Sequence, residues 1–227
     1  MIKAVVFDVD GTIVDSVDLH AEAWQEAFKK FGKEVDLQAV RRQIGKGADQ
    51  LLPVFFSKRE LDEFGAVLDK YRGALFKKQY MPRVEAFPKV RELFERIRHG
   101  GKRIALASSA KKDELASYKK IARIDDLVDA ETSSDDAERS KPHADIFQAA
   151  LEKLAGIAAK EVLVVGDTPY DVEAAAKVNL TTVGLLCGGW QEAELRQAGC
   201  VVVYRDPADF LNHYAESPPR HRKACRR

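Results

Sequence analysis

Short apolar runs alternate with amphipathic segments from Pro88 onward, and this alternation restricts the fold more than any other feature of the chain. The clearest runs are RIALAS (103–108), EVLVVGD (161–167) and TTVGLL (181–186). Strands that alternate with helices are typical of a parallel sheet whose two faces are covered by helices. The N-terminal run IKAVVF (2–7) is equally apolar and β-branched, so we expect it to join the same sheet.

The segment that follows this first strand shows only helical periodicity up to about residue 80. Val17, Ala21 and Trp24 begin a series of apolar residues at helical spacing. We therefore predict an α/β fold, a doubly wound parallel sheet with a Rossmann-like core, into which an α-helical cap domain is inserted. The predicted core comprises residues 1–15 and 82–227, and the predicted cap comprises residues 16–81.

The composition excludes several classes of partner. The 227 residues carry a formal net charge of +1, which gives no electrostatic reason to expect binding to nucleic acid or to a membrane. No apolar run approaches the roughly 18 residues of a membrane-spanning helix, and the N-terminus lacks the pattern of a signal peptide.

Cys187, Cys200 and Cys225 have neither metal-ligand nor disulfide spacing, so a cytoplasmic location is expected. The basic tail at 217–227 is expected to be a solvated terminus.

Polar residues stand where the predicted strands end. They are Asp8, Asp10 and Thr12 after the first strand, Ser108 after RIALA, Asp167 and Asp171 after EVLVVG, and Lys141 before a helix. In open parallel sheets, ligands bind beyond the carboxyl ends of the strands. These side chains are therefore expected to meet at one edge of the sheet.

Two aspartates one residue apart cost free energy unless a cation lies between them or one of them is protonated. Asp8, Asp10 and Asp167 together offer only oxygen ligands, which suit Mg²⁺, and no histidine or cysteine cluster suits zinc. Ser108 and the peptide N–H groups near it would hold an anion, and Lys141 would bind phosphate. A carboxylate nucleophile, a divalent cation, a hydroxyl group and a lysine describe phosphoryl transfer through an aspartyl-phosphate.

Four motifs in this order and spacing resemble those of the haloacid dehalogenase superfamily. They are DVDGT (8–12), LASS (106–109), SKP (140–142) and GDTPYD (166–171). The helical insertion after the first motif resembles the small helical cap of that superfamily. The segments DLHAEAW (18–24) and RIALASSA (103–110) are most similar to its beta-phosphoglucomutase and phosphoglycolate phosphatase-like branch.

The resemblance implies a role for each motif residue. Asp8 would be the nucleophile and Asp10 the general acid–base. Mg²⁺ would be held by Asp8, by the backbone carbonyl of Asp10 and by Asp167. Ser108 would bind the transferring phosphoryl group, and Lys141 would neutralise charge on Asp8 and the phosphate.

Other residues would support the site or meet the substrate. Asp171 and Thr12 would orient the site. His20 and Lys46 in the cap are candidates for contact with substrate. His20 fits an ordinary surface position equally well, and Lys46 fits a solvated loop charge.

We therefore predict a Mg²⁺-dependent phosphatase that acts on a small phosphorylated metabolite, with a phosphomutase on the same scaffold as the alternative. The cap loop IGKGADQLL (44–52) has Ala48 and Asp49 near the place where the mutases carry a phosphate-binding arginine, which disfavours that alternative. A dehalogenase would need no metal, and a signalling receiver has no helical insertion after its first strand. A catalytically silent binding protein is disfavoured because no motif residue is missing.

The chain departs from the family pattern at one turn, where Lys89 stands at a position that is often glycine in the family.

Overall fold

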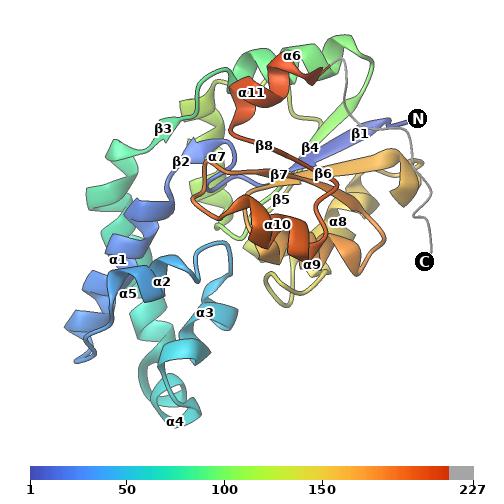
Figure 1. Ribbon diagram of the computed structural model, residues 1–227. Coiled ribbons are helices and arrows are strands. Elements are labelled where there is room, and N and C mark those ends of the chain that lie inside the picture. The colour runs from blue at the N-terminus through green and yellow to red at the C-terminus, as the bar shows by residue number, and fades with distance from the viewer. Residues whose placement is uncertain (215–227) are drawn as a thin grey trace.

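The computed structural model of this chain describes residues 1–214, so the basic tail at 217–227 lies outside the described residues. A six-stranded sheet forms its centre, with all neighbouring strands parallel (Figure 1). Its spatial order is β5 (Ala130–Thr132), β4 (Arg103–Ala107), β1 (Ala4–Phe7), β6 (Val162–Gly166), β7 (Thr181–Leu185) and β8 (Val202–Tyr204). The predicted α/β fold is confirmed, and the first strand lies at the middle of the sheet.

Both faces of the sheet are buried, which explains why its central strands β1 and β6 are apolar throughout. Val5 and Phe7 of β1 belong to one hydrophobic cluster, and Ala4 and Val6 belong to another on the opposite face. The first cluster includes residues of α6 (Val90–His99), α7 (Lys112–Ala122) and α11 (Pro207–Asn212). The second includes residues of α8 (Asp145–Lys153) and α9 (Pro169–Ala176), and α10 (Glu192–Ala198) packs beside α9.

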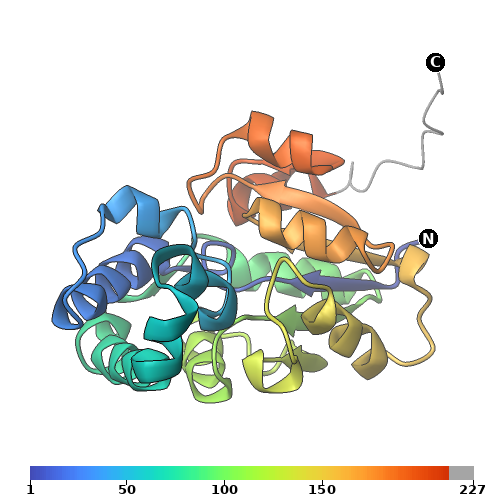
Figure 2. The same ribbon diagram turned by 90° about the horizontal axis from the view of Figure 1, so that it is seen from below.

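The helical insertion lies at the end of the core toward which β1 runs (Figures 1 and 2). It has its own hydrophobic cluster, in which Trp24, Phe28, Leu51 and Leu68 are buried. Its elements are α1 (Val17–Lys30), α2 (Leu37–Arg41), α3 (Ala48–Phe55), α4 (Lys58–Glu60), the π-helix Leu61–Gly65, α5 (Ala66–Leu75), the π-helix Phe76–Tyr80 and the 3₁₀-helix Met81–Arg83. Trp24 thus packs inside the cap.

Two short strands join the ends of this insertion. β2 (Val14–Asp15) and β3 (Glu85–Ala86) pair antiparallel, so the chain enters and leaves the helical segment at one place. Further connections are the 3₁₀-helices Ser134–Asp136 and Ala159–Glu161. The domain boundaries after residues 15 and 81 stay a prediction.

Lys89 adopts the left-handed backbone conformation, with φ of 67°, directly before α6. A side chain in this conformation costs roughly 1 kcal/mol, which glycine avoids. We expect Lys89→Gly to raise the free energy of unfolding by about 1 kcal/mol and the Tm by about 2–4 °C in thermal unfolding. The ion pair that it loses, with Glu92, is exposed and contributes little.

A second lysine provides the control for this change. Lys120 is exposed in the last turn of α7, where glycine costs up to about 1 kcal/mol relative to a good helix former. Lys120→Gly should therefore lower the Tm. Equal destabilisation by both substitutions would show that backbone strain at Lys89 is negligible.

Candidate active site

Four separate segments bring their polar side chains together beyond the carboxyl ends of β1, β4 and β6. Asp8 follows β1, Ser108 follows β4, Asp167 follows β6, and Lys141 comes from the loop before α8. All four side chains are buried, as is that of Asp171 in the first turn of α9. The carboxylates of Asp8 and Asp167 meet because β1 and β6 are neighbours in the sheet.

Lys141 lies at the centre of this group. Its Nζ forms ion pairs with Asp8 and with Asp171, the latter at 2.7 Å, and donates a hydrogen bond to the carbonyl of Ala107 at 3.1 Å. Burial alone would lower the pKa of Lys141, but the charges of Asp171 and Asp8 outweigh it and raise that pKa. The lysine therefore stays positively charged in a fully buried position.

Three carboxylates converge on one point. One oxygen from each of Asp8, Asp167 and Asp171 lies within 4.8 Å of the others. Burial raises the pKa of Asp8 to about 7 despite the opposing charge of Lys141. Burial, together with the charges of Asp8 and Asp171, also holds the pKa of Asp167 well above its usual range.

The free oxygens of this triad indicate where a cation fits. Asp8 Oδ2 and Asp167 Oδ2 are buried without a hydrogen-bond partner. Asp171 is occupied otherwise, because one of its oxygens pairs with Lys141 and the other accepts hydrogen bonds from the N–H and hydroxyl of Thr168 at 3.0 and 2.7 Å. Uncompensated buried carboxylate oxygens are unfavourable, and a hard divalent cation would compensate them.

The carboxylate of Asp167 is fixed by its neighbours. Thr12 Oγ1 donates a hydrogen bond to Asp167 Oδ1 at 2.9 Å. A Cβ at Gly188 or at Gly11 would overlap Asp167 Oδ2, and Gly11 also has φ of +78°. Glycine at both positions thus leaves room for this carboxylate.

Gly188→Ala should displace Asp167 and lower the rate of phosphate ester hydrolysis by about a hundredfold, since a shift of about 1 Å in a catalytic group has effects of this size. Steady-state kinetics with Mg²⁺ would measure it. Gly65→Ala is the matched control, because its added Cβ meets only Leu61 at an ordinary distance. A fully active Gly188→Ala protein would show that activity does not depend on the exact position of the Asp167 carboxylate.

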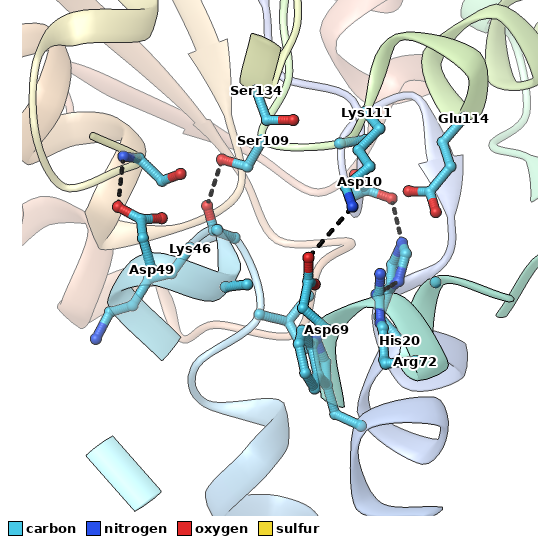
Figure 3. Close-up of a pocket in the computed structure, with 18 of the residues that line it drawn as sticks. Asp10, His20, Lys46, Asp49, Asp69, Arg72, Ser109, Lys111, Glu114 and Ser134 are labelled. Atoms are coloured by element: carbon cyan, nitrogen blue, oxygen red, sulfur yellow. Dashed lines mark hydrogen bonds and ion pairs between the residues drawn. The ribbon is translucent and has the colours of Figure 1, made fainter. Parts of the chain in front are cut away.

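The side chain of Asp10 is joined to His20 of the cap (Figure 3). Its Oδ1 accepts hydrogen bonds from Ser16 Oγ at 2.6 Å and from His20 Nε2 at 2.8 Å. Burial raises the pKa of Asp10, but His20, Ser16 and the charge of Arg72 outweigh burial and lower it below the usual value. The structure therefore separates Asp10 from the other acids and connects it with the cap.

His20 is buried rather than a surface residue, so the interpretation of it as an ordinary surface side chain is wrong. Its ring stacks on Phe76 with centroids 3.9 Å apart, and its Nε2 lies 2.9 Å from the hydroxyl of Tyr118. Arg72 contacts His20 Nδ1. A guanidinium only donates, so Nδ1 accepts and the Nε2 proton is directed at Asp10.

Above these residues lies a cavity of about 520 Å³ between core and cap (Figure 3). Ser108 Oγ accepts a hydrogen bond from the N–H of Ala110 at 3.0 Å at the base of this region. Lys46 lines the cavity; its Nζ donates to Gln43 at 2.6 Å and lies 4.6 Å from the ring centre of Tyr170. Burial lowers the pKa of Lys46.

The cap loop at 42–49 is bonded to the core. Ser109 Oγ donates to the carbonyl of Gly45 at 3.2 Å, and the N–H of Ser140 donates to Asp49 at 3.0 Å. The hydroxyl of Tyr170 donates to the carbonyl of Arg42 at 2.6 Å. These contacts close the cap over the carboxyl edge of the sheet.

The sequence did not identify Arg72 and Glu114 as residues that line the cavity, or Tyr118 as a partner of His20. The sequence could have indicated Arg72, because this charged residue shares one face of a helix with the apolar residues Leu68 and Leu75. Glu114 and Tyr118 stand four residues apart on α7, and only the packing of that helix against the cap reveals their position.

A buried carboxylate paired with a lysine, and a pair of free carboxylate oxygens, lie under a helical cap at the carboxyl edge of a parallel sheet, an arrangement that fits a hydrolase. The family model described as "Haloacid dehalogenase-like hydrolase" matches residues 5–185, and the chain belongs to this family. The predicted resemblance is thus confirmed.

Relatives of known name support the same class. The chain is 25% identical over 211 residues to "Phosphorylated carbohydrates phosphatase" of Thermotoga maritima, covering 92% of this chain and 97% of that protein. It is 30% identical over 225 residues to "Phosphoglycolate phosphatase" of Yersinia pestis, covering 96% and 92%. It is also 30% identical over 209 residues to "Protein SUPPRESSOR OF QUENCHING 1, chloroplastic" of Arabidopsis thaliana. This match covers 90% of this chain but only 20% of that longer protein.

The fold has a solved counterpart. A hydrolase from Pseudomonas syringae superimposes with a TM-score of 0.86 at 31% identity, covering 95% of this chain and 99% of that one. Among residues 1–214, no helix has the length and hydropathy that crossing a membrane requires.

Proposed function

We propose that this protein is a Mg²⁺-dependent phosphatase that hydrolyses a small phosphate monoester through an aspartyl-phosphate. The observation that carries the proposal is the pair of buried, unpartnered oxygens on Asp8 and Asp167, next to the charged Lys141. Asp8 lines the cavity and pairs with the buried Lys141, and a nucleophilic carboxylate beside a lysine fits attack on a phosphate group. The phosphatase names of the two bacterial relatives support the same reaction.

Asp8, the backbone carbonyl of Asp10 and Asp167 would hold the metal ion. When bound, the ion would supply the positive charge that allows an anionic carboxylate to approach an anionic phosphate. The donor set is entirely oxygen, as Mg²⁺ prefers.

The protein's own groups carry the two steps. Asp8 attacks phosphorus, the bond to the leaving oxygen breaks, and Asp10, which takes up a proton before this step, gives it to that oxygen to release an alcohol. Asp10 then takes a proton from water, the water oxygen attacks phosphorus, and Asp8 is released with inorganic phosphate. Ser108 and Lys141 hold the phosphoryl oxygens during both steps. Asp171 keeps Lys141 in place through its 2.7 Å ion pair.

The structure gives no support to the mutase alternative. A mutase needs a second phosphate site in the cap, and the residue at that place is Asp49, which accepts a hydrogen bond from Ser140. A carboxylate there would repel a phosphate group.

Phosphate release from an aryl phosphate and from a panel of phosphorylated metabolites, with Mg²⁺ present, tests the proposal. We expect turnover of the aryl phosphate and selective turnover within the panel. Absence of phosphate release from every ester by the folded protein would contradict it.

A further inference from the structure

Glu114 is a buried carboxylate that has no partner in the described part of the chain. It lines the cavity, is only 3% exposed, and lies in the first turn of α7. Its carboxylate forms no ion pair and accepts no hydrogen bond among residues 1–214. The helix N-terminus stabilises its charge, which explains how the burial is tolerated but leaves its oxygens free.

Arg72 is the complementary group on the cap side. Its guanidinium lies 4.8 Å from the ring centre of Trp24 and 5.0 Å from that of Phe76, and it pairs with no carboxylate in the described residues. Its Nη2 contacts His20 Nδ1, and its Nη1, which forms no hydrogen bond or ion pair among the described residues, is the donor left for a ligand. Of the neighbouring charges that line the cavity, Lys111 is paired with Asp69 at 3.2 Å.

Glu114 and Arg72 therefore present one free acceptor and one free donor to the same side of the cavity. Figure 3 shows Glu114 reaching from α7 toward the side where His20 and Arg72 lie. No ion pair joins the two side chains. A group that fits between them must donate to a carboxylate and accept from a guanidinium, and a hydroxyl group does both.

We propose that Glu114 and Arg72 select esters whose leaving group carries hydroxyl groups, that is, phosphates of polyols or sugars. This inference rests on the proposed phosphatase function. An alkyl ester would leave both buried groups unpaired, which costs affinity in the transition state. An ester with a carboxylate, such as 2-phosphoglycolate, would meet the negative charge of Glu114.

The test compares two esters with the same six-carbon chain, sorbitol 6-phosphate and n-hexyl phosphate. We expect wild-type kcat/KM to be at least about tenfold higher for the sorbitol ester, the effect of a hydrogen bond to a charged group. The ratio of the two kcat/KM values is the readout, because changes in Asp8 or Asp10 affect both esters equally.

Glu114→Leu should reduce this ratio by about tenfold, and Glu114→Gln by less, because glutamine retains a neutral acceptor. Arg72→Lys should also reduce it, since lysine lacks the planar donors of arginine. Glu63→Leu, at an exposed carboxylate of the cap outside the cavity, is the control and should leave the ratio unchanged. Glu114→Gln is isosteric, so it tests the proposal even where the leucine variant does not fold.

Three results would overturn the inference: equal wild-type hydrolysis of the two esters, a preference for 2-phosphoglycolate, or an unchanged ratio in both Glu114 variants. An enzyme that hydrolyses these esters without discrimination contradicts only the assignment of Glu114 and Arg72. A folded wild-type protein that releases phosphate from none of them, nor from an aryl phosphate with Mg²⁺, contradicts the proposed function and this inference together.

Discussion

We expect Asp8→Asn to reduce phosphate release from an aryl phosphate by at least about a thousandfold, because an amide would not replace a carboxylate as the proposed nucleophile. The side chain lies at the end of the central strand β1, where it pairs with Lys141 and lines the cavity. Steady-state kinetics at saturating Mg²⁺ measures this loss.

The fold should survive this change. Asparagine has the same shape, and Lys141 keeps its 2.7 Å ion pair with Asp171. The circular dichroism spectrum of the variant should match that of the wild type. Asp62→Asn, at an exposed carboxylate of the cap, controls for the loss of one charge and should retain activity. An active Asp8→Asn protein would show that the nucleophile is another residue.

We expect removal of metal ions by EDTA to abolish activity and Mg²⁺ to restore it. Mg²⁺ at about a hundred times its Kd should also raise the Tm at pH 8 by about 5–10 °C, as ligand linkage predicts for a chain of this size. The shift should be smaller at pH 5, because protons on the acidic triad compete with the cation.

The direction in which pH changes the stability of the metal-free protein follows from the pKa of Asp8. Burial raises its pKa from an ordinary 3.8 to about 7 in the folded, metal-free protein. A raised pKa contributes stability that is complete below pH 3.8 and is lost as the pH rises through about 7. Mg²⁺ therefore stabilises most where the carboxylates are ionised.

Asp167→Asn should lose most of this Tm shift, because it removes one of the two free carboxylate oxygens. Differential scanning fluorimetry with and without Mg²⁺, at both pH values, provides the measurement. Full activity in EDTA, with no response of the Tm to Mg²⁺, would contradict a metal site at the triad.

The sequence by itself determined which segments become strands and helices, and which polar residues stand at strand ends. The spacing of apolar residues differs between strands and helices, and this difference can be read within a short stretch of sequence. A strand such as β6 is apolar throughout because both of its faces are buried. Asp8, Asp167 and Lys141 could be predicted to converge, because residues after parallel strands share one edge.

Only the tertiary structure decided which of these groups contact one another. The order β5-β4-β1-β6-β7-β8 places β1 beside β6 and so brings Asp8 against Asp167, and no local pattern encodes that pairing. The same holds for the cap: His20 is buried, and Arg72 and Glu114 face one cavity, because α1, α5 and α7 pack together across distant parts of the chain. Periodicity fixes the face of a helix but not the partner that covers it, and for this reason the determinants of substrate choice appeared only in the folded protein.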